Sequence, residues 1–199
     1  YVPALWPLLD FEPQQMIVCT YQAISGAGKT FASWPEMVDN VIPYIGGEDE
    51  KSEREPMKIF GRVENGAIVP ATGLTISAQC LRVACTDGHM AAVSVQFAKK
   101  PTIEQILERW ANCHPATEGM DLPSSPATFL KYFDDPSRPQ TRLDRDFEHG
   151  MGITIGRLRE DAVFDYKFVC LSHNTLRGAA GGGVLSAEYL CRLGYLQAK

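Results

Sequence analysis

The chain of 199 residues has no long hydrophobic run, no excess of positive charge and no paired cysteine motif. Every apolar run is far shorter than the roughly 18 residues that a membrane-spanning helix needs, so no membrane partner is expected. The 19 Lys and Arg are outnumbered by 24 Asp and Glu and do not cluster, which argues against a nucleic-acid partner. With 45% hydrophobic and 22% charged residues, the composition excludes a disordered chain, a collagen and a coiled coil.

The six cysteines form no Cys-x-x-Cys pair and lie mostly within apolar segments. Reduced thiols of a cytoplasmic protein are therefore expected rather than a disulfide framework. A zinc site needs Cys and His residues at ligand spacing, and only Cys85 with His89 comes near it. Because nothing supplies the other ligands, no metal is expected.

The N-terminal residues, Tyr1-Val2-Pro3, include no initiating Met and no signal-peptide pattern. Leu5, Leu8 and Leu9 already form a short apolar helical face before any cap or turn. We expect the chain to be a portion of a longer protein.

Five segments are rich in β-forming residues or alternate apolar with polar side chains, as strands do. They are residues 16–22, 78–86, 90–98, 153–159 and 163–171. The last two are expected to form a hairpin. Together with the helices described next, they predict an α+β domain built on one sizeable sheet.

Two helices are predicted from capping and periodicity. Thr102 with Gln105 forms a capping box, and the apolar residues that follow it repeat at helical spacing through Trp110. A second helix is expected to start at Ser33-Pro35. Its buried stripe would comprise four apolar residues, namely Met37, Val38, Val41 and Ile42.

Residues 113–150 are polar and rich in Pro, Asp and Arg, and they predict a long irregular excursion of the functional or interface-forming kind. After it, Asn174 or Thr175 is expected to cap a final helix that ends at Gly194. The glycine-rich first half of that helix suggests close approach to another backbone or a ligand.

Residues 23–30 (AISGAGKT) fit a relaxed phosphate-loop pattern, with Ala23 where the first glycine normally stands. A phosphate loop opens directly into a helix, whereas here Ser33 and Pro35 restart a helix several residues later. No apolar strand ending in a magnesium-binding Asp is evident either. The segment is better explained as a glycine turn that lets a ligand approach the backbone.

Arg82 and His89 are the strongest candidates for a site on the residues alone. Arg82 lies in an apolar strand and needs an anionic partner, either internal or supplied by a ligand. His89 follows a tight Asp87-Gly88 turn at the start of the next strand. A lone histidine is more often structural, but the pair at one end of a sheet suggests a site for an anionic substrate, with His89 exchanging protons. Glu48 and Lys51 fit a solvated i, i+3 pair equally well.

Five segments in order resemble aspartate-semialdehyde dehydrogenases, most closely the archaeal and fungal branch. They are TYQAISGAG (20–28), PEMVDNVIPYI (35–45), GEDEK (47–51), CLRVACTDGHMAAV (80–93) and SHNTLRGAAGG (172–182). The resemblance implies the α+β C-terminal domain of the glyceraldehyde-3-phosphate dehydrogenase-like class, a mixed sheet with helices on one face. It further implies a catalytic and dimerisation domain over 1–172 and a helix over 173–199 that would pack on an absent N-terminal nucleotide-binding domain.

The family reductively dephosphorylates β-aspartyl phosphate to aspartate β-semialdehyde with NADPH, on the route to lysine, threonine and methionine. By resemblance, the cofactor would be NADP, the small-molecule partners would be these substrates and phosphate, and the chain would form a homodimer or homotetramer. The sheet would supply much of the dimer interface.

By resemblance, Arg82 would bind the substrate α-carboxylate, a bidentate task that suits a planar guanidinium. His89 would be the general acid/base, and Gln22 would orient the acyl intermediate. Glu48 would hold the substrate amino group, with Lys51 near the phosphate. Three residues would lie against the nicotinamide end of the cofactor: Ser25, Gly26 and Asn174.

The sequence departs from the family in its nucleophile, a cysteine within an Asn-Cys-Ser/Thr stretch that opens a helix. Only Cys113 follows an Asn here, and it lies near the end of its helix. We expect the chain alone to be inactive. Two alternatives stay open: a dimerisation fragment without chemistry, and a sibling acyl-phosphate reductase such as the N-acetylglutamyl-phosphate enzyme. Glu48, Lys51 and Arg82 favour a free amino acid over an acetylated one.

Overall fold

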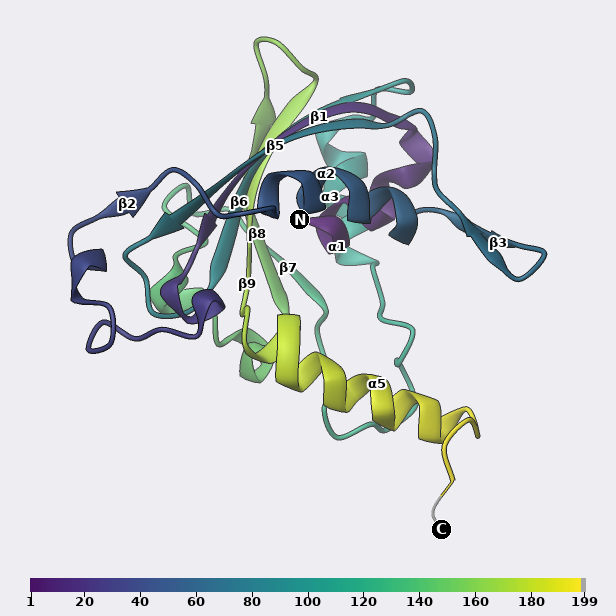
Figure 1. Cartoon of the computed structure of the whole chain (residues 1–199). Helices are drawn as coiled ribbons and strands as arrows, with labels where there is room; N and C mark the ends of the chain where they lie inside the picture. Colours follow the sequence, from purple (N-terminus) through teal and green to yellow (C-terminus); the bar gives the residue numbers. More distant parts are fainter. Residues whose placement is uncertain (198–199) are drawn as a thin grey trace.

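The computed structural model describes residues 1–197 and is built on a mixed sheet of seven strands (Figure 1). The strand order is β2-β5-β1-β6-β9-β8-β7. The pairs β1–β5 and β7–β8 are parallel, and the other neighbours are antiparallel. The bounds are β1 Pro13–Gln22, β2 Val41–Ile42, β5 Thr75–Val83, β6 His89–Phe97, β7 Leu130–Phe133, β8 Ile153–Glu160 and β9 Tyr166–Ser172. All five predicted strands are present, and β8 and β9 form the expected hairpin.

Helices cover one face of this sheet, as the resemblance implied (Figure 1). They are α1 (Val2–Leu5) with the 3₁₀ turn η1 (Trp6–Phe11), α2 (Glu48–Ile59) and α3 (Ile103–Ala111). The predicted capping box of α3 is confirmed, since Thr102 and Gln105 hydrogen-bond each other's backbone N–H. The densely charged residues 48–58 are helical in α2.

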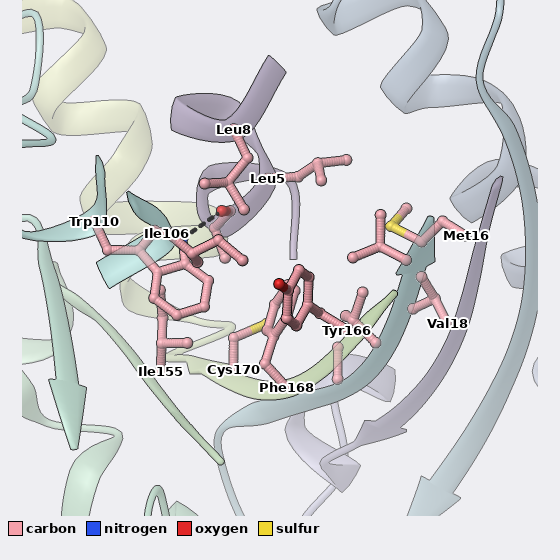
Figure 2. Close-up of a cluster of buried hydrophobic side chains, with 14 of the residues drawn as sticks. Leu5, Leu8, Met16, Val18, Ile106, Trp110, Ile155, Tyr166, Phe168 and Cys170 are labelled. Atoms are coloured by element: carbon pink, nitrogen blue, oxygen red, sulfur yellow. Dashed lines mark hydrogen bonds between the residues drawn. The ribbon is translucent and has the colours of Figure 1, made fainter. Parts of the chain in front are cut away.

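The core lies between these helices and the sheet (Figure 2). Leu5, Leu8 and Trp110 are at most 1% exposed, and the Trp110 ring packs edge-on against Phe168, with ring centroids 5.2 Å apart. The indole Nε1 donates to the Ala4 carbonyl at 2.7 Å, so the one polar atom of the ring is satisfied. Burial of this kind contributes about 25 cal/mol per Å² of apolar surface.

The opposite face of the sheet is largely open. Ile17 is 48% exposed and Tyr21 36% exposed, whereas their neighbours Met16 and Val18 are buried on the helix side. This alternation is the expected strand pattern, with one face toward the core. Among residues 1–197, no helix combines the length and apolar composition needed to cross a membrane.

The predicted helix starting at Ser33-Pro35 is wrong. A single 3₁₀ turn, η3 (Pro35–Met37), is followed by the short edge strand β2, and only Met37 of the expected stripe is buried. Val38 and Val41 are 61% and 53% exposed. Asp39 has φ +57°, a left-handed conformation that interrupts any helix there.

The excursion over residues 113–150 is more ordered than its composition indicated. It contains the edge strand β7, the short helix α4 (Thr141–Asp144) and the 3₁₀ turn η4 (Phe147–Gly150). Elsewhere β3 (Arg62–Glu64) and β4 (Ala67–Val69) form a separate two-stranded ribbon (Figure 1).

The final helix begins with a π-helical turn, η5 (Leu176–Ala180), and continues as α5 (Gly181–Arg192). Neither Asn174 nor Thr175 caps it through a side chain; instead the backbone N–H of Leu176 donates to Nδ1 of His173. Gly194 has φ +80° and follows the end of the helix as predicted. The last two residues of the predicted segment 173–199, Ala198 and Lys199, lie outside the described residues.

Candidate functional site

The site candidates converge at one end of the sheet because of strand register. In the parallel pair of β1 and β5, Gln22 lies opposite Arg82, and β6 begins beside them with His89. All three side chains belong to the helix-covered face, since each shares the parity of the buried residues on its strand. The structure therefore brings Arg82 and His89 together at a sheet end, as the sequence predicted.

Arg82 is a buried cation, 7% exposed, that no carboxylate of residues 1–197 pairs with directly. Its Nη1 donates to the carbonyl of Ala23 at 2.7 Å. Burial lowers the pKa of the guanidinium, and the nearby charge of Glu48 opposes that shift. A guanidinium has five N–H donors, so most of its capacity to bind an anion remains available.

His89 is held in one neutral form by the backbone of the glycine loop. The N–H of Ala23 donates to Nδ1 at 3.1 Å, so in the neutral ring the proton is on Nε2. Burial lowers the pKa of His89 to about 4, and the charge of Arg82 adds to the shift. The Gly88 carbonyl and the carboxylates of Glu48 and Asp87 act in the opposite direction. At neutral pH His89 is thus uncharged and donates through Nε2.

Gly26 lies against both of these side chains. A Cβ at this position would be 2.9 Å from Nη1 of Arg82 and 2.9 Å from Nε2 of His89. Real Cβ contacts essentially never come so close. Only glycine fits here without moving the Arg82–His89 pair.

The glycine loop is not a phosphate loop, in agreement with the sequence interpretation. Its residues form the 3₁₀ turn η2 (Ile24–Ala27). The backbone N–H groups of Ile24 and Ser25 donate to the carbonyls of Cys85 and Thr86, at 2.9 and 3.2 Å. Amides used in this way are not free to surround a phosphate.

Asn174 joins the glycine loop to the turn before His89. Its Oδ1 accepts from the N–H of Gly88 at 2.8 Å, and its Nδ2 donates to Oγ of Ser25 at 2.9 Å. One amide N–H and one oxygen lone pair remain for a ligand, a set that matches a carboxamide group. Ser25, Gly26 and Asn174, the three residues expected at the cofactor, thus border the Arg82–His89 pair.

Glu48 reaches the site through Gln22, whose Nε2 donates to Oε2 of Glu48 at 3.3 Å. Burial alone would raise the pKa of Glu48, but hydrogen bonds from Lys51 and Gln22 and the charges of Lys51 and Arg82 lower it. Lys51 bonds Glu48 at 2.7 Å and is 56% exposed, while Glu48 is 26% exposed. Glu48 therefore belongs to the site through Gln22, whereas Lys51 lies on the solvent-exposed side of Glu48.

A cavity of about 430 Å³ opens between α1 and the ends of β1, β6 and β9. Gln22 and His89 line it together with Thr20, which hydrogen-bonds Gln22 at 3.3 Å. Arg177 also lines it; its guanidinium lies 4.9 Å from the centre of the Phe129 ring, and Nη1 is buried without a partner among residues 1–197. Arg177 lies in segment 172–182, which carries the family resemblance, but nothing in its sequence spacing predicts a place near β1.

All six cysteines are unpaired in the described part of the chain. Cys170 lines the cavity, Cys80 is buried, and Cys113 follows the last turn of α3. Burial raises the pKa of both Cys80 and Cys113, which disfavours the thiolate form. Within residues 1–197, no group of three or more His, Cys, Asp or Glu side chains could hold a metal ion.

The chain is similar to known aspartate-semialdehyde dehydrogenases. It is 46% identical to that of Schizosaccharomyces pombe over 187 residues (92% of this chain, 52% of that protein) and 40% identical to that of Archaeoglobus fulgidus over 191 residues (96% and 54%). The structure matches that of the Candida albicans enzyme, determined with NADP, at a TM-score of 0.86 and 37% identity, covering 97% of this chain and 55% of that one.

The chain thus spans about half the length of the relatives it matches. The family model described as "Semialdehyde dehydrogenase, dimerisation domain" matches residues 5–177, which include β1 to β9 and all the candidate site residues. The mixed sheet with helices on one face agrees with this assignment. The chain therefore belongs to the semialdehyde dehydrogenase dimerisation domain family.

Proposed function

We propose that the chain is the substrate-binding and acid/base portion of an aspartate-semialdehyde dehydrogenase, which reductively dephosphorylates β-aspartyl phosphate to aspartate β-semialdehyde. One observation carries this proposal: the buried Arg82 has no carboxylate bound to it within residues 1–197 and lies beside a neutral His89 that donates through Nε2. A buried cation of this kind is stabilised by an anionic ligand.

The proposed substrate fits the charges of the site. Arg82 binds the α-carboxylate through parallel N–H donors. Glu48, held ionised by its neighbours, accepts from the α-ammonium group, and Gln22 beside it orients the acyl group. Lys51 lies on the outer side of Glu48, where it attracts the phosphate. The Arg82–Glu48 combination favours a free amino acid over an acetylated one, and thus disfavours an N-acetylglutamyl-phosphate reductase.

His89 acts on the substrate carbonyl oxygen. Its Nε2–H stabilises negative charge as it develops on that oxygen, and the same atom is where the ring gives and takes a proton. The burial that lowers the pKa of His89 keeps the ring neutral across the physiological range. NADP would be held at its nicotinamide end by Ser25, Gly26 and Asn174, and its reduced form, NADPH, would supply the hydride.

We assign catalytic and dimerisation roles to residues 1–172 and a nucleotide-domain contact to residues 173–199. The second assignment is supported by exposed apolar side chains on the last helix, among them Val184 at 52% and Leu193 at 47%. The open face of the sheet, with Ile17 and Tyr21, supports a homodimer or homotetramer. Free thiols suit a reducing cytoplasm.

Titration of the ¹⁵N-labelled chain with L-aspartate β-semialdehyde tests the proposal. We expect saturable shifts of the Arg82 Nε–H, the Gln22 side-chain amide and the His89 ring. Arg82→Lys loses one fork of the carboxylate contact and weakens binding at least about tenfold. Arg109→Lys, on the exposed Arg109–Asp10 pair, is the matched control. Shifts that Arg82→Lys leaves unaltered would contradict the proposal.

The inactivity of the chain alone is a separate proposal. It is supported by the lack of an Asn-Cys-Ser/Thr stretch in the sequence and by burial, which raises the pKa of Cys80 and Cys113. Mixed with aspartate semialdehyde, phosphate and NADP, the chain should give no phosphate-dependent formation of NADPH at 340 nm on an extended time course. Steady phosphate-dependent turnover would overturn this, and loss of that turnover in Cys170→Ser would identify the thiol responsible. A dimerisation fragment without chemistry predicts neither turnover nor substrate shifts.

A further inference from the structure

The turn before His89, residues 86–88, is held by a side chain from the long excursion. Nη1 of Arg145 donates to Oγ1 of Thr86 at 2.8 Å and to the carbonyl of Asp87 at 3.2 Å. The Arg145 side chain is 23% exposed; its hydrogen bond to Asp87 is partly buried, whereas the one to Thr86 is exposed. One guanidinium thus joins two of the three residues of the turn.

Gly88 completes this packing. It has φ +95°, and a Cβ there would lie 3.3 Å from Cβ of Arg145 and 3.3 Å from Cδ1 of Leu171. The aliphatic part of Arg145 therefore covers the turn on one side while Leu171 covers it on another. The N–H of Gly88 donates to Asn174, which fixes the backbone just before His89.

The residue before Arg145 holds this part of the excursion together. Asp144 is 4% exposed and accepts from Nε of Arg138 at 2.7 Å and from the N–H of Gln140 at 2.6 Å. Burial would raise the pKa of Asp144, but these hydrogen bonds and the charge of Arg138 lower it. The Arg138 guanidinium also stacks 4.4 Å from the centre of the Phe133 ring. The excursion is therefore a fixed support at this point.

We infer that Arg145 is a positioning residue for His89. By holding Thr86 and Asp87, it fixes the turn from which the imidazole enters the site and keeps Nδ1 on the Ala23 N–H, so that the ring proton stays on Nε2. Its importance for catalysis rests on the proposed function, whereas its effect on the ring does not. This assigns a role to the excursion, which composition alone marked only as functional or interface-forming.

The charged groups that face His89 are few. Arg82 lies on its own sheet, Glu48 is on α2 and Asp87 is in the turn itself. Arg145 is not among the groups that shift the pKa of His89. Removal of the Arg145 charge should therefore act on the ring through geometry rather than through direct repulsion.

The test compares Arg145→Met, which keeps an unbranched aliphatic chain over Gly88, with Arg142→Met on the exposed surface of α4, which ends just before Arg145. Long-range ¹H–¹⁵N spectra of the labelled chain report which ring nitrogen of His89 carries the proton. We expect Arg145→Met to mix the two tautomers and to move the pKa of His89 toward its ordinary value of about 6.5. Arg142→Met should leave both unchanged, and Arg145→Lys should restore part of the Nε2–H form.

An Nε2–H spectrum and a pKa of His89 unchanged by Arg145→Met would overturn the inference. Thr86→Val removes only the hydroxyl that accepts from Arg145, so it should shift the His89 tautomers in the same direction but by less. This variant tests the role of Arg145 if Arg145→Met does not fold. L-aspartate β-semialdehyde is titrated into the same samples. If the unaltered chain does not bind it, the proposed function fails while the ring spectra still decide the role of Arg145.

Discussion

Arg82 faces Gln22 across the parallel pair of β1 and β5, and this register builds the site. It places the guanidinium within the influence of Glu48, which hydrogen-bonds Gln22, and beside the glycine loop that follows β1. A one-residue slip of β5 would turn Arg82 to the open face of the sheet. The site therefore depends on the strand pairing as much as on the side chains themselves.

Gly26→Ala should weaken substrate binding strongly with little loss of stability. The new Cβ would meet Nη1 of Arg82 and Nε2 of His89 at 2.9 Å, and both are the ends of side chains that can move away. We expect unfolding free energy to fall by about 1 kcal/mol. Misplacement of binding groups on the ångström scale should weaken binding of the semialdehyde by up to about 100-fold. Urea denaturation and the substrate titration measure the two effects.

Gly183→Ala is the matched control for this change. Gly183 lies in α5, and a Cβ there has no neighbour within 4 Å. Alanine should stabilise the helix by up to about 1 kcal/mol and leave binding unaltered. Equal binding by Gly26→Ala and the unaltered chain would show that the Arg82–His89 pair does not need the space beside Gly26.

Asn174→Asp and Asn174→Ala should distinguish the contributions of the two Asn174 hydrogen bonds to stability. The aspartate keeps an acceptor for the Gly88 N–H but loses the donor to Ser25, and the alanine loses both. Alanine should cost about 1–3 kcal/mol of unfolding free energy, because it leaves a partly buried N–H without a partner, and aspartate should cost less. Thermal denaturation of both variants measures the difference.

Asn40→Ala controls for the substitution itself, since Asn40 bonds only an exposed backbone carbonyl of Glu36. Its effect should stay within about 0.5 kcal/mol. Equal stability of Asn174→Ala and the unaltered chain would contradict a role for Asn174 in joining the glycine loop to the turn at Gly88.

The sequence was most informative where local chemistry decides structure. The Thr102 capping box, the alternation in β6 and the Asp87-Gly88 turn each depend on residues close together in the chain, and each is confirmed. The meeting of Arg82 and His89 was predictable because the short connection between β5 and β6 keeps the end of one strand near the start of the other, although β1 lies between them in the sheet. The family resemblance supplied the rest of the fold.

Two predictions from the sequence were wrong, and each has a physical cause at particular residues. The helix expected after Ser33 does not form, because Asp39 adopts a left-handed conformation and Val41 and Ile42 pair with β5 instead. Asn174 resembled a helix cap in sequence, yet its side chain is used by Ser25 and Gly88, far away in the chain. Long-range partners of this kind override local preference and leave no local signal.

The stability of the chain should depend on pH through His89. The folded pKa of about 4 lies below the ordinary value of about 6.5, so the unfolded state binds the proton more readily. Stability from this group is fully present above about pH 6.5 and is lost as the pH falls toward 4. Urea denaturation at several pH values should show this loss, and His89→Gln should show a smaller one over the same window.

His114→Gln is the control, because His114 is 59% exposed and pairs with Glu118 on the surface. It should follow the unaltered chain between pH 6.5 and 4. A pH profile of His89→Gln that coincides with that of the unaltered chain would mean that His89 titrates normally and is not buried in neutral form.

Asp144→Asn should destabilise the chain strongly. The 4% exposed carboxylate of Asp144 pairs with Arg138 and accepts from the N–H of Gln140, and the neutral amide would leave Arg138 without its anionic partner. The pair is partly buried, since the Arg138 side chain is 26% exposed, so we expect a loss of about 1–3 kcal/mol of unfolding free energy. The exposed pair of Asp10 and Arg109 is the control, and Asp10→Asn should cost at most about 1 kcal/mol. Similar losses in the two variants, measured by urea denaturation, would contradict the view that Asp144 fixes the excursion.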